Sequence, residues 1–509
     1  MSQQQPTTSN GLQASVSRDP LTHNAKISVM GTLDFSQVVA PENVQVDSQG
    51  IIELVDALDA DPLIAPHALL IARHAQLITR GSWEPYRPDQ PGLVYSLSKS
   101  FAITGLGIAV QEGLVALDEP VLAAFPECDD ASISEYTRRI SVKHMAMMSS
   151  GHATGMWPLL RATAPDELFR AFFHTPPAKE PGTLFAYNQM ATYSIAEIIH
   201  RRTGIRFLDW LRPRLLEPLG VDAADWQQLV PGMDLGFTGL FVSPDAIAAL
   251  AQLYLNGGEY GGVRIVPEWW VHEATRYQIS NAHWSPDTDW KSGYGYHFWM
   301  CQHGFRGDGA FGQYCLVLPE QDMIVALTSE TFAMQRVLDL VWQHLLPAVE
   351  RTPDTSGSND PLAGRTLPLP FVIGDSDLGK VCFESRQPHT QVAGGATIED
   401  DLTLIAVRHV AVKLDAAVGT LVLSDDNVSL CATLRIGEWT TTAREASCPF
   451  TIATAAAVDA ETLRVSVVFL ETPHRLELIC ERASGRCVAD WVTPALLGSS
   501  LSDLGFSGA

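Results

Sequence analysis

One serine and one lysine have the spacing of a nucleophile and its base. Ser96 and Lys99 are three residues apart in the run YSLSKS, at the start of a helical pattern over 100–115. One helical turn brings such side chains together, and the helix N-terminus adds positive potential where an oxyanion would develop. A lysine without water around it can be neutral and accept the serine proton. The pair therefore predicts nucleophilic catalysis, with a surface Ser–Lys pair at a helix start as the alternative.

The elements around this pair mix helical and strand patterns from about residue 30 to residue 350. Apolar residues recur at helical spacing in some segments and form short buried runs in others. The patterns predict helices over 100–115, 191–205, 243–255 and 332–349, a strand over 67–77 that turns toward 79–82, and an antiparallel hairpin of 314–318 with 323–328.

The chain changes character after residue 350. Residues 351–370 are rich in Pro, Gly, Ser and Asp and are typical of a linker. Strand patterns dominate beyond it, at 402–414, 419–423, 428–436, 463–470 and 475–480. We therefore predict a flexible arm (1–30), an α+β domain (31–350), the linker, and an all-β domain (371–509) that is barrel-like, in the manner of a lipocalin, or a sandwich.

The cysteines and histidines do not form a recognisable metal site. Five of the eight cysteines lie in the predicted β domain at spacings that match no zinc pattern, and we expect buried thiols: Cys382, Cys431, Cys448, Cys480 and Cys487. His144 and His152 are isolated, and we expect them to be structural. The sequence predicts no metal.

The overall charge excludes some partners. The 509 residues carry 58 acidic and 34 basic side chains, a net charge of −24, which disfavours nucleic acid and anionic membranes as partners. Residues 1–29 lack the apolar run of a secretory signal, and no window approaches 18 apolar residues. We expect a soluble, cytoplasmic protein. The sequence leaves a homo-oligomer open.

Four segments resemble, in order and spacing, the serine β-lactamase and penicillin-binding-protein superfamily, most closely its class C β-lactamase and esterase branch. They are SLSKSFAITGLGIAVQEGLVALDEPV (96–121), ISVKHMAMMSSG (140–151), FAYNQMATYSIAEIIHRRTG (185–204) and GDGAFGQYCLVLPEQDMIVALT (307–328). The resemblance covers roughly residues 50–350. It implies an antiparallel sheet with helices on both sides, and a helical region between the first and second motifs.

The resemblance also implies roles for individual residues. Ser96 matches the acylated nucleophile, Lys99 its general base, and Tyr187 the tyrosine that carries the proton to the leaving group. A cationic lysine lowers the pKa of a phenol beside it, so we expect tyrosinate and lysine to share the work of the base. The N–H groups of Ser96 and Ala310 are the expected oxyanion hole. Ser98 and Ser100 are out of register with Lys99.

Two motifs depart from the family pattern. The second motif is usually Tyr-x-Asn, but here Gln189 takes the third place and Asn188 lies beside it, so both amides are candidates for substrate binding. The third motif usually begins with Lys or His, but here it is Gly307-Asp308-Gly309. The missing cation argues against penicillins and D-Ala-D-Ala peptides as substrates, unless Arg306 or His303 replaces it.

Several residues are expected to line the substrate site. Residues 309–312 would form the strand beside the acyl group, which makes Asp308, Gly309 and Phe311 candidates. Eight of the twelve tryptophans fall between Trp157 and Trp299, and an aromatic-walled pocket that includes these two is one interpretation. Ordinary core packing is the other.

We therefore expect a serine hydrolase that cleaves an ester or amide of a small molecule through an acyl-enzyme, with an ester favoured and no cofactor. A β-lactamase or D-stereospecific peptidase, an acyltransferase and a catalytically silent binding protein are the alternatives. Residues 307–312 also satisfy G-x-G-x-x-G, but a strand follows them instead of the helix that a dinucleotide site needs. A Ser-centred G-x-S-x-G elbow is absent from the sequence.

Overall fold

We describe the protein from a computed structural model, in which the described residues are 31–351, 360–371, 380–392, 403–445, 448, 450–498 and 500–506. The predicted arm (1–30) and residues 352–359 of the predicted linker lie outside the described residues. Among the described helices, none is both long and apolar enough to cross a membrane.

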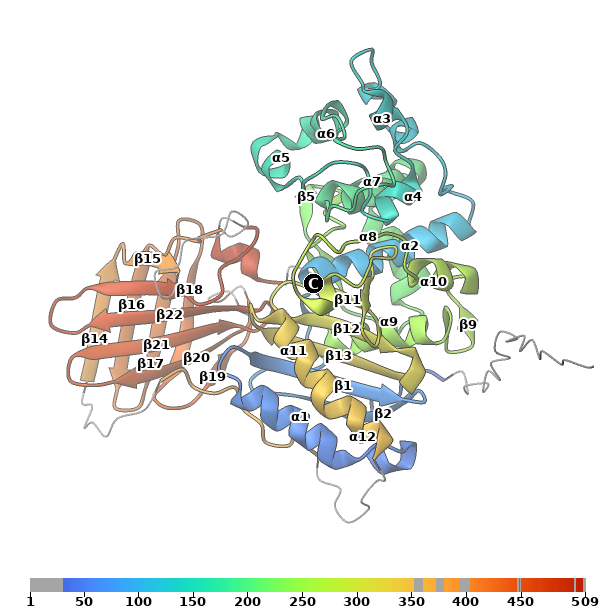
Figure 1. Ribbon diagram of the computed structural model, residues 1–509. Helices are drawn as coiled ribbons and strands as arrows, with labels where there is room; N and C mark the ends of the chain where they lie inside the picture. The colour runs from blue at the N-terminus through green and yellow to red at the C-terminus, as the bar shows by residue number, and fades with distance from the viewer. Residues whose placement is uncertain are drawn as a thin grey trace, which may run out of the picture.

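A sheet of six antiparallel strands forms the centre of the N-terminal part of the chain (Figure 1). Its middle joins distant segments, because Ala65 pairs with Glu330 and Arg73 with Met323. The predicted hairpin near residue 320 is confirmed. In spatial order the strands are β10 (Trp299–Cys301), β11 (Gly304–Gly309), β12 (Gln313–Leu318), β13 (Met323–Glu330), β1 (Ala65–Arg73) and β2 (Gln76–Ser82).

The central strands are buried on both faces. Leu69 and Ile71 of β1 enter one core, and Leu70 and Ala72 enter another on the opposite face. Successive side chains of a strand point to opposite faces, so a strand covered on both sides is a continuous apolar run. The first core contains α1 (Ser48–Ala60), α11 (Met334–Leu340) and α12 (Leu346–Glu350), and the second contains α2 (Ser98–Gln111) and α9 (Pro244–Leu255).

The strand predicted over 67–77 is in fact two strands. β1 ends at Arg73, and β2 begins at Gln76. His74 and Ala75 between them have φ values of +54° and +57°, the pair of left-handed residues that a tight hairpin turn requires. The predicted turn at 79–82 was wrong because neither Gly nor Asn marks the true turn.

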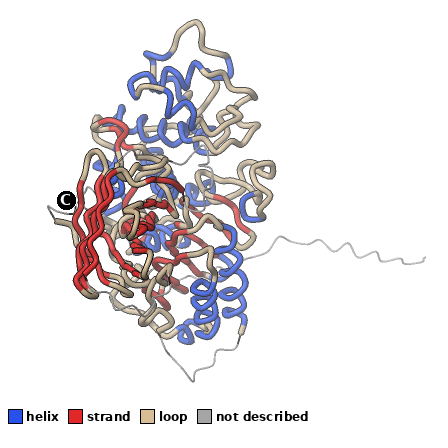
Figure 2. The backbone as a smooth tube through the Cα atoms, turned by 90° about the vertical axis from the view of Figure 1, so that its left-hand side faces the viewer, coloured by secondary structure: helices blue, strands red, loops and turns tan. Residues whose placement is uncertain are grey.

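The segment between the first two motifs is helical, as the resemblance implied, and forms a lobe at the top of both views (Figures 1 and 2). Predicted helix ends with cap signals are confirmed. Ser243 accepts a hydrogen bond from the N–H of Ala246 and starts α9, and Gly204, at φ +70°, ends α7. The helices between the motifs are α3 (Glu135–Arg138), α4 (Val142–Ala146), α5 (Trp157–Ala162) and α6 (Leu168–His174). The next two are α7 (Gln189–Thr203), which begins in the second motif, and α8 (Phe207–Leu211).

The C-terminal β region, defined as the described residues from 380 to 506, consists of two sheets that share one apolar core. The described strands do not close into the predicted barrel, because the two sheets remain separate in their pairing. One sheet has the order β14 (Lys380–Arg386), β16 (His409–Asp415), β17 (Val418–Ser424), β18 (Ser429–Arg435). The other has the order β15 (His389–Val392), β23 (Cys487–Trp491), β22 (His474–Glu481), β21 (Thr462–Phe469), β20 (Ile452–Val458), β19 (Thr440–Thr442).

The prediction of five buried thiols in this region was only partly right. Cys448 is a buried thiol, but Cys382 and Cys431 are exposed. Cys480 and Cys487 form a disulfide, because the antiparallel register of β22 and β23 places them opposite each other. Spacing along the chain gave no sign of that register.

A buried cluster of charges joins the two parts of the chain. Arg475 of β22 lies with its Nε 3.4 Å from Glu330 of β13 and 3.9 Å from Glu477 of β22. Glu330 also accepts a hydrogen bond from the hydroxyl of Thr493. One arginine thus faces two carboxyl groups. Burial raises the pKa of Glu477 to about 7, although Ser466 and Arg475 act in the opposite direction.

Replacing Glu477 by Gln is expected to flatten the pH dependence of stability between about pH 4.5 and pH 7. In this window the folded protein binds more protons at Glu477 than the unfolded chain does, so stability falls as pH rises. The shift corresponds to roughly 2–3 kcal/mol in the free energy of unfolding. Urea unfolding at pH 5 and pH 8 measures it, with Glu481→Gln at the exposed end of the same strand as control. An unchanged pH slope in Glu477→Gln would contradict the assignment.

Candidate active site

Ser96 and Lys99 meet in the interior at the start of α2. Ser96 lies in a short 3-10 turn (Tyr95–Leu97) that runs into α2, and Lys99 is the second residue of that helix. The Nζ atom of Lys99 lies 3.1 Å from Oγ of Ser96 and donates to the carbonyl oxygen of Phe237 at 2.8 Å. Lys99 is 1% exposed, whereas Ser96 is partly exposed. A ligand can therefore reach Ser96, whereas Lys99 is shielded from solvent.

The surroundings of Lys99 favour its neutral form. Burial lowers the pKa of Lys99 well below its ordinary value, and the Asp308 carboxylate offsets only part of this effect. A neutral amine can donate to the Phe237 carbonyl and keep its lone pair for the Ser96 proton. The chemistry predicted for this pair is thus available to it.

Tyr187 completes the group from the loop before α7. Its ring centroid lies 4.5 Å from Nζ of Lys99, and the side chain of Ser96 acts to lower the pKa of its hydroxyl. Burial raises the pKa of Tyr187, and the charge of Asp308 raises it further. The predicted tyrosinate was therefore wrong, because the lysine beside this phenol is itself driven toward the neutral form. Tyr187 is a neutral phenol that can pass on a proton.

The third motif approaches the nucleophile because it has glycines where a side chain would collide. A Cβ at Gly309 would lie 2.0 Å from the carbonyl oxygen of Val94, and one at Gly307 would lie 2.3 Å from Oγ of Ser100. β11 ends at Gly309, and residues 310–312 form the turn into β12. Of the strand predicted over 309–312, only Gly309 belongs to a strand, and the other three residues form the turn.

Two left-handed residues frame the predicted oxyanion hole. Tyr95 precedes Ser96 with a φ of +48°, and Phe311 follows Ala310 with a φ of +66°. Such backbone conformations are uncommon for residues other than glycine and cost roughly 1–3 kcal/mol each, so the surroundings must hold them. Within the described part of the chain, the N–H of Ala310 has no hydrogen-bond acceptor. That N–H group is thus free to bind an oxyanion.

A buried ion pair flanks Gly307, the position at which the resemblance places a cation. Arg306 donates from Nε to the carboxylate of Asp308 at 2.7 Å, and the two side chains are 0% and 4% exposed. The guanidinium also lies over the rings of Trp290 and Trp299, at 4.4 and 5.6 Å. Arg306 is thus near the site, but its charge is already neutralised. The ring of His303 instead packs against that of Trp342, with the two planes tilted by 59°.

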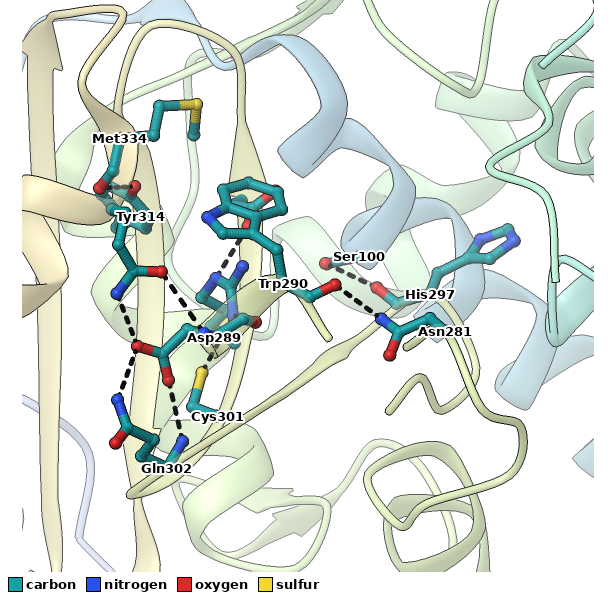
Figure 3. Close-up of polar contacts among 12 residues, drawn as sticks. Ser100, Asn281, Asp289, Trp290, His297, Cys301, Gln302, Tyr314 and Met334 are labelled. Atoms are coloured by element: carbon teal, nitrogen blue, oxygen red, sulfur yellow. Dashed lines mark hydrogen bonds and ion pairs between the residues drawn. The ribbon is translucent and has the colours of Figure 1, made fainter. Parts of the chain in front are cut away.

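The segment before β10 anchors Arg306 (Figure 3). Nη1 of Arg306 donates to the carbonyl oxygen of Asp289 at 2.7 Å and lies 3.1 Å from Sγ of Cys301. Burial acts to raise the pKa of Asp289, but hydrogen bonds from the N–H of Gln302 and the amide of Gln335 are among those that bring it below its ordinary value. This network of hydrogen bonds holds the side chain of Arg306 in position.

Aromatic rings stand on two sides of Tyr187 and Lys99, in line with the predicted pocket. Trp299 stacks on Tyr187 with centroids 5.3 Å apart, and Trp284 lies 6.2 Å from the same ring. On the other side, Trp157 lies 6.0 Å from Phe237, whose carbonyl binds Lys99. That these tryptophans contact a substrate stays a prediction.

The other predicted binding residues have different surroundings. The side chain of Asn188 caps α7 through the N–H of Met190 and bonds to Ser150, so the fold already uses this amide. Gln189 is 3% exposed, and its side-chain oxygen has no hydrogen-bond partner among the described residues. Phe311 is buried in an apolar cluster behind the turn instead of facing the acyl position. Of these three, Gln189 remains the candidate.

No sequence pattern indicated that the C-terminal β region reaches this site. Tyr95, next to the nucleophile, is hydrogen-bonded to His474 of β22 at 2.6 Å, although 379 residues separate them. Leu496 and Phe506 pack in the same cluster as Ala310. The contact of Lys99 with Phe237 was also missed, because its acceptor is a backbone carbonyl oxygen, which every residue has.

Comparisons with known proteins agree with this geometry. Residues 51–348 match the Beta-lactamase family. The 6-aminohexanoate-dimer hydrolase of Paenarthrobacter ureafaciens is 26% identical over 220 residues, which are 40% of this chain and 55% of that protein. The chain thus spans little more than half the length of this curated relative.

The chain is similar to several solved structures. EstCE1, a hydrolase with promiscuous acyltransferase activity, has a TM-score of 0.50 and 14% identity, over 58% of this chain and 98% of its own. The octameric penicillin-binding protein homologue from Pyrococcus abyssi has a TM-score of 0.48 and 15% identity, over 84% of this chain and 97% of its own. At 14% identity, the likeness to EstCE1 concerns the fold alone.

Proposed function

Because the chain belongs to the beta-lactamase family, we propose that it is a serine hydrolase that opens an ester or amide bond of a small molecule through an acyl-enzyme on Ser96. One observation carries the proposal: Oγ of Ser96 lies 3.1 Å from the buried Nζ of Lys99. A serine hydroxyl is a weak nucleophile until an adjacent base takes its proton. Neutral Lys99 is that base.

Acylation follows from the placement of these groups. Oγ of Ser96 attacks the substrate carbonyl carbon as its proton moves to Nζ of Lys99. The N–H groups of Ser96 and Ala310 hold the oxyanion, which a preorganised pair of donors stabilises most in the transition state. The bond to the leaving group then breaks, and Tyr187 passes the proton from Lys99 to that group. A water molecule, deprotonated by the same residues, releases the acid and restores Ser96.

The electrostatics of the site favour an uncharged substrate. Asp308 neutralises Arg306, which leaves that cation unavailable to a substrate carboxylate. The protein also carries a net charge of −24, which disfavours anionic ligands. We therefore place neutral carboxylic esters first among the substrates.

One observation supports a small amide as the second substrate class. The buried side-chain oxygen of Gln189 lacks a partner among the described residues and could accept the N–H of an amide. A buried acceptor without a partner is costly, so a ligand that supplies a donor would gain affinity. The 26% identical relative is named for the hydrolysis of a dimer of an amino acid, which agrees with this alternative.

Labelling with a fluorophosphonate tests the proposal. The reagent is expected to add one phosphonyl group to the wild-type protein, which peptide mass spectrometry locates on Ser96, and to leave Ser96→Ala unlabelled. Ser100→Ala, a serine of the same helix outside the site, is the control and should be labelled like the wild type. An adduct elsewhere, or equal labelling of Ser96→Ala, would sink the assignment. A panel of p-nitrophenyl esters, anilides and nitrocefin then ranks the substrate classes.

A further inference from the structure

Three aromatic rings from distant parts of the chain meet behind the predicted oxyanion hole. Tyr95 and Phe311 lie edge to face with centroids 5.1 Å apart. The ring of His474 lies 5.8 Å from Tyr95 and 5.7 Å from Phe311, again edge to face. His474 is 1% exposed. The C-terminal β region thus supplies the ring that contacts both left-handed residues of the site.

The hydrogen bonds of His474 fix its tautomer and its orientation. Its Nδ1 lies 2.9 Å from the carbonyl oxygen of Thr493, which can only accept, so Nδ1 carries the proton. Nε2 is then an acceptor, and the hydroxyl of Tyr95 donates to it at 2.6 Å. Burial lowers the pKa of His474 to about 4, so the ring keeps this neutral form at neutral pH.

These contacts bear on the two residues whose N–H groups would bind the oxyanion. Tyr95 is directly before Ser96, and Phe311 is directly after Ala310. The backbone conformation of Tyr95 orients the N–H of Ser96 directly, and the packing of Phe311 restrains the turn that contains Ala310. A ring that is held by β22 and packs on both aromatic side chains therefore restrains both donors at once.

We propose that His474 is a positioning residue for the oxyanion hole, which it holds by packing on Tyr95 and Phe311 and by accepting the hydrogen bond of Tyr95. The inference rests on the proposed function, because it assumes that Ser96 is acylated. It assigns the C-terminal β region a role in the transition state of the reaction that the N-terminal part carries out.

Two variants and two measurements test this role. His474→Ala removes the ring, and Tyr95→Phe keeps both rings but removes the hydrogen bond. The rate of Ser96 labelling by a fluorophosphonate and the affinity for phenylboronic acid, a tetrahedral adduct former, both depend on the oxyanion donors. In His474→Ala both are expected to fall about 10- to 100-fold, because small misplacements at a reacting centre have effects of this size. In Tyr95→Phe the labelling rate and the boronate affinity should both fall, but less than in His474→Ala.

A matched control separates positioning from general stability. Trp439→Phe removes the hydrogen bond that the indole of Trp439 gives to the Leu367 carbonyl, in an apolar cluster separate from that of Tyr95. It should change thermal stability but leave labelling and boronate affinity at wild-type levels. Wild-type values in both His474→Ala and Tyr95→Phe would overturn the inference, and Tyr95→Phe decides alone if His474→Ala does not fold. A wild type that is not labelled would instead overturn the proposed function.

Discussion

Replacing Lys99 by methionine is expected to slow the acylation of Ser96 by about 10²- to 10⁴-fold, the contribution of a well-placed general base. Methionine has a similar length and suits the buried position, so the variant should fold. Lys99 lies next to Ser96, and burial lowers its pKa, which favours the neutral amine that can accept a proton. Neutral Tyr187 does not replace it, because its own pKa is raised. The rate of the p-nitrophenol burst with p-nitrophenyl acetate measures the loss.

The pH dependence of the acylation rate is a second test of Lys99 as the base. The reactive form of Lys99 is deprotonated, so the acylation rate rises as pH passes the lowered pKa of this lysine and levels off above it. Wild-type enzyme should therefore work near neutral pH. Lys99→Arg keeps a permanent charge and should lose activity like Lys99→Met. Lys143→Met on α4 is the control. More than about a tenth of wild-type acylation in Lys99→Met would contradict the assigned base.

Replacing Arg306 by methionine is expected to lower the free energy of unfolding by about 3–5 kcal/mol, the cost of leaving one buried charge of a pair alone. Both partners are almost fully buried, and Asp308 would lose the guanidinium that donates to it. Asp308→Asn should also destabilise the protein. The double variant Arg306→Met/Asp308→Asn should lose less than the sum of the two, because neither charge remains. Urea unfolding at pH 7 gives all three values.

An exposed ion pair provides the comparison. Arg87 and Asp89 are 2.8 Å apart, but their side chains are 69% and 51% exposed. Surface pairs of this kind contribute about 0–1 kcal/mol, so Arg87→Met should change stability little. Additive losses in the Arg306/Asp308 double variant would mean that the two side chains act independently, and would contradict the pairing.

The sequence indicated those parts of the fold that depend on local chemistry. Two helix ends were predicted from capping residues, Ser243 before Pro244 and Gly204 after a helical pattern. A residue that caps a helix provides for its free N–H groups at the start or its free carbonyl groups at the end, so the signal is local. The hairpin around Pro319 was predicted because two strand-like runs flank a short turn segment. The grouping of Ser96, Lys99 and Tyr187 needed the family resemblance, since Tyr187 is far away in sequence.

Properties that arise from long-range contact could not be predicted in this way. The neutral state of Tyr187 depends on burial and on Asp308, which a motif does not reveal. The pairing of Arg306 with Asp308 depends on both side chains lying on one face of β11. The register that joins Cys480 to Cys487 and the contact of Tyr95 with His474 require the folded C-terminal β region.

The contact between Tyr95 and His474 also has a consequence in time. A ribosome that adds about 5–20 residues per second needs roughly 20–80 s to travel the 379 residues between them. Throughout this interval the nascent N-terminal part carries Tyr95 without its hydrogen-bond partner, beside the apolar residues Leu93, Phe241 and Phe311. On the role proposed for His474, the oxyanion donors are held in place only after β22 has emerged and folded. Newly made chains would then acquire activity in one late step instead of gradually during synthesis.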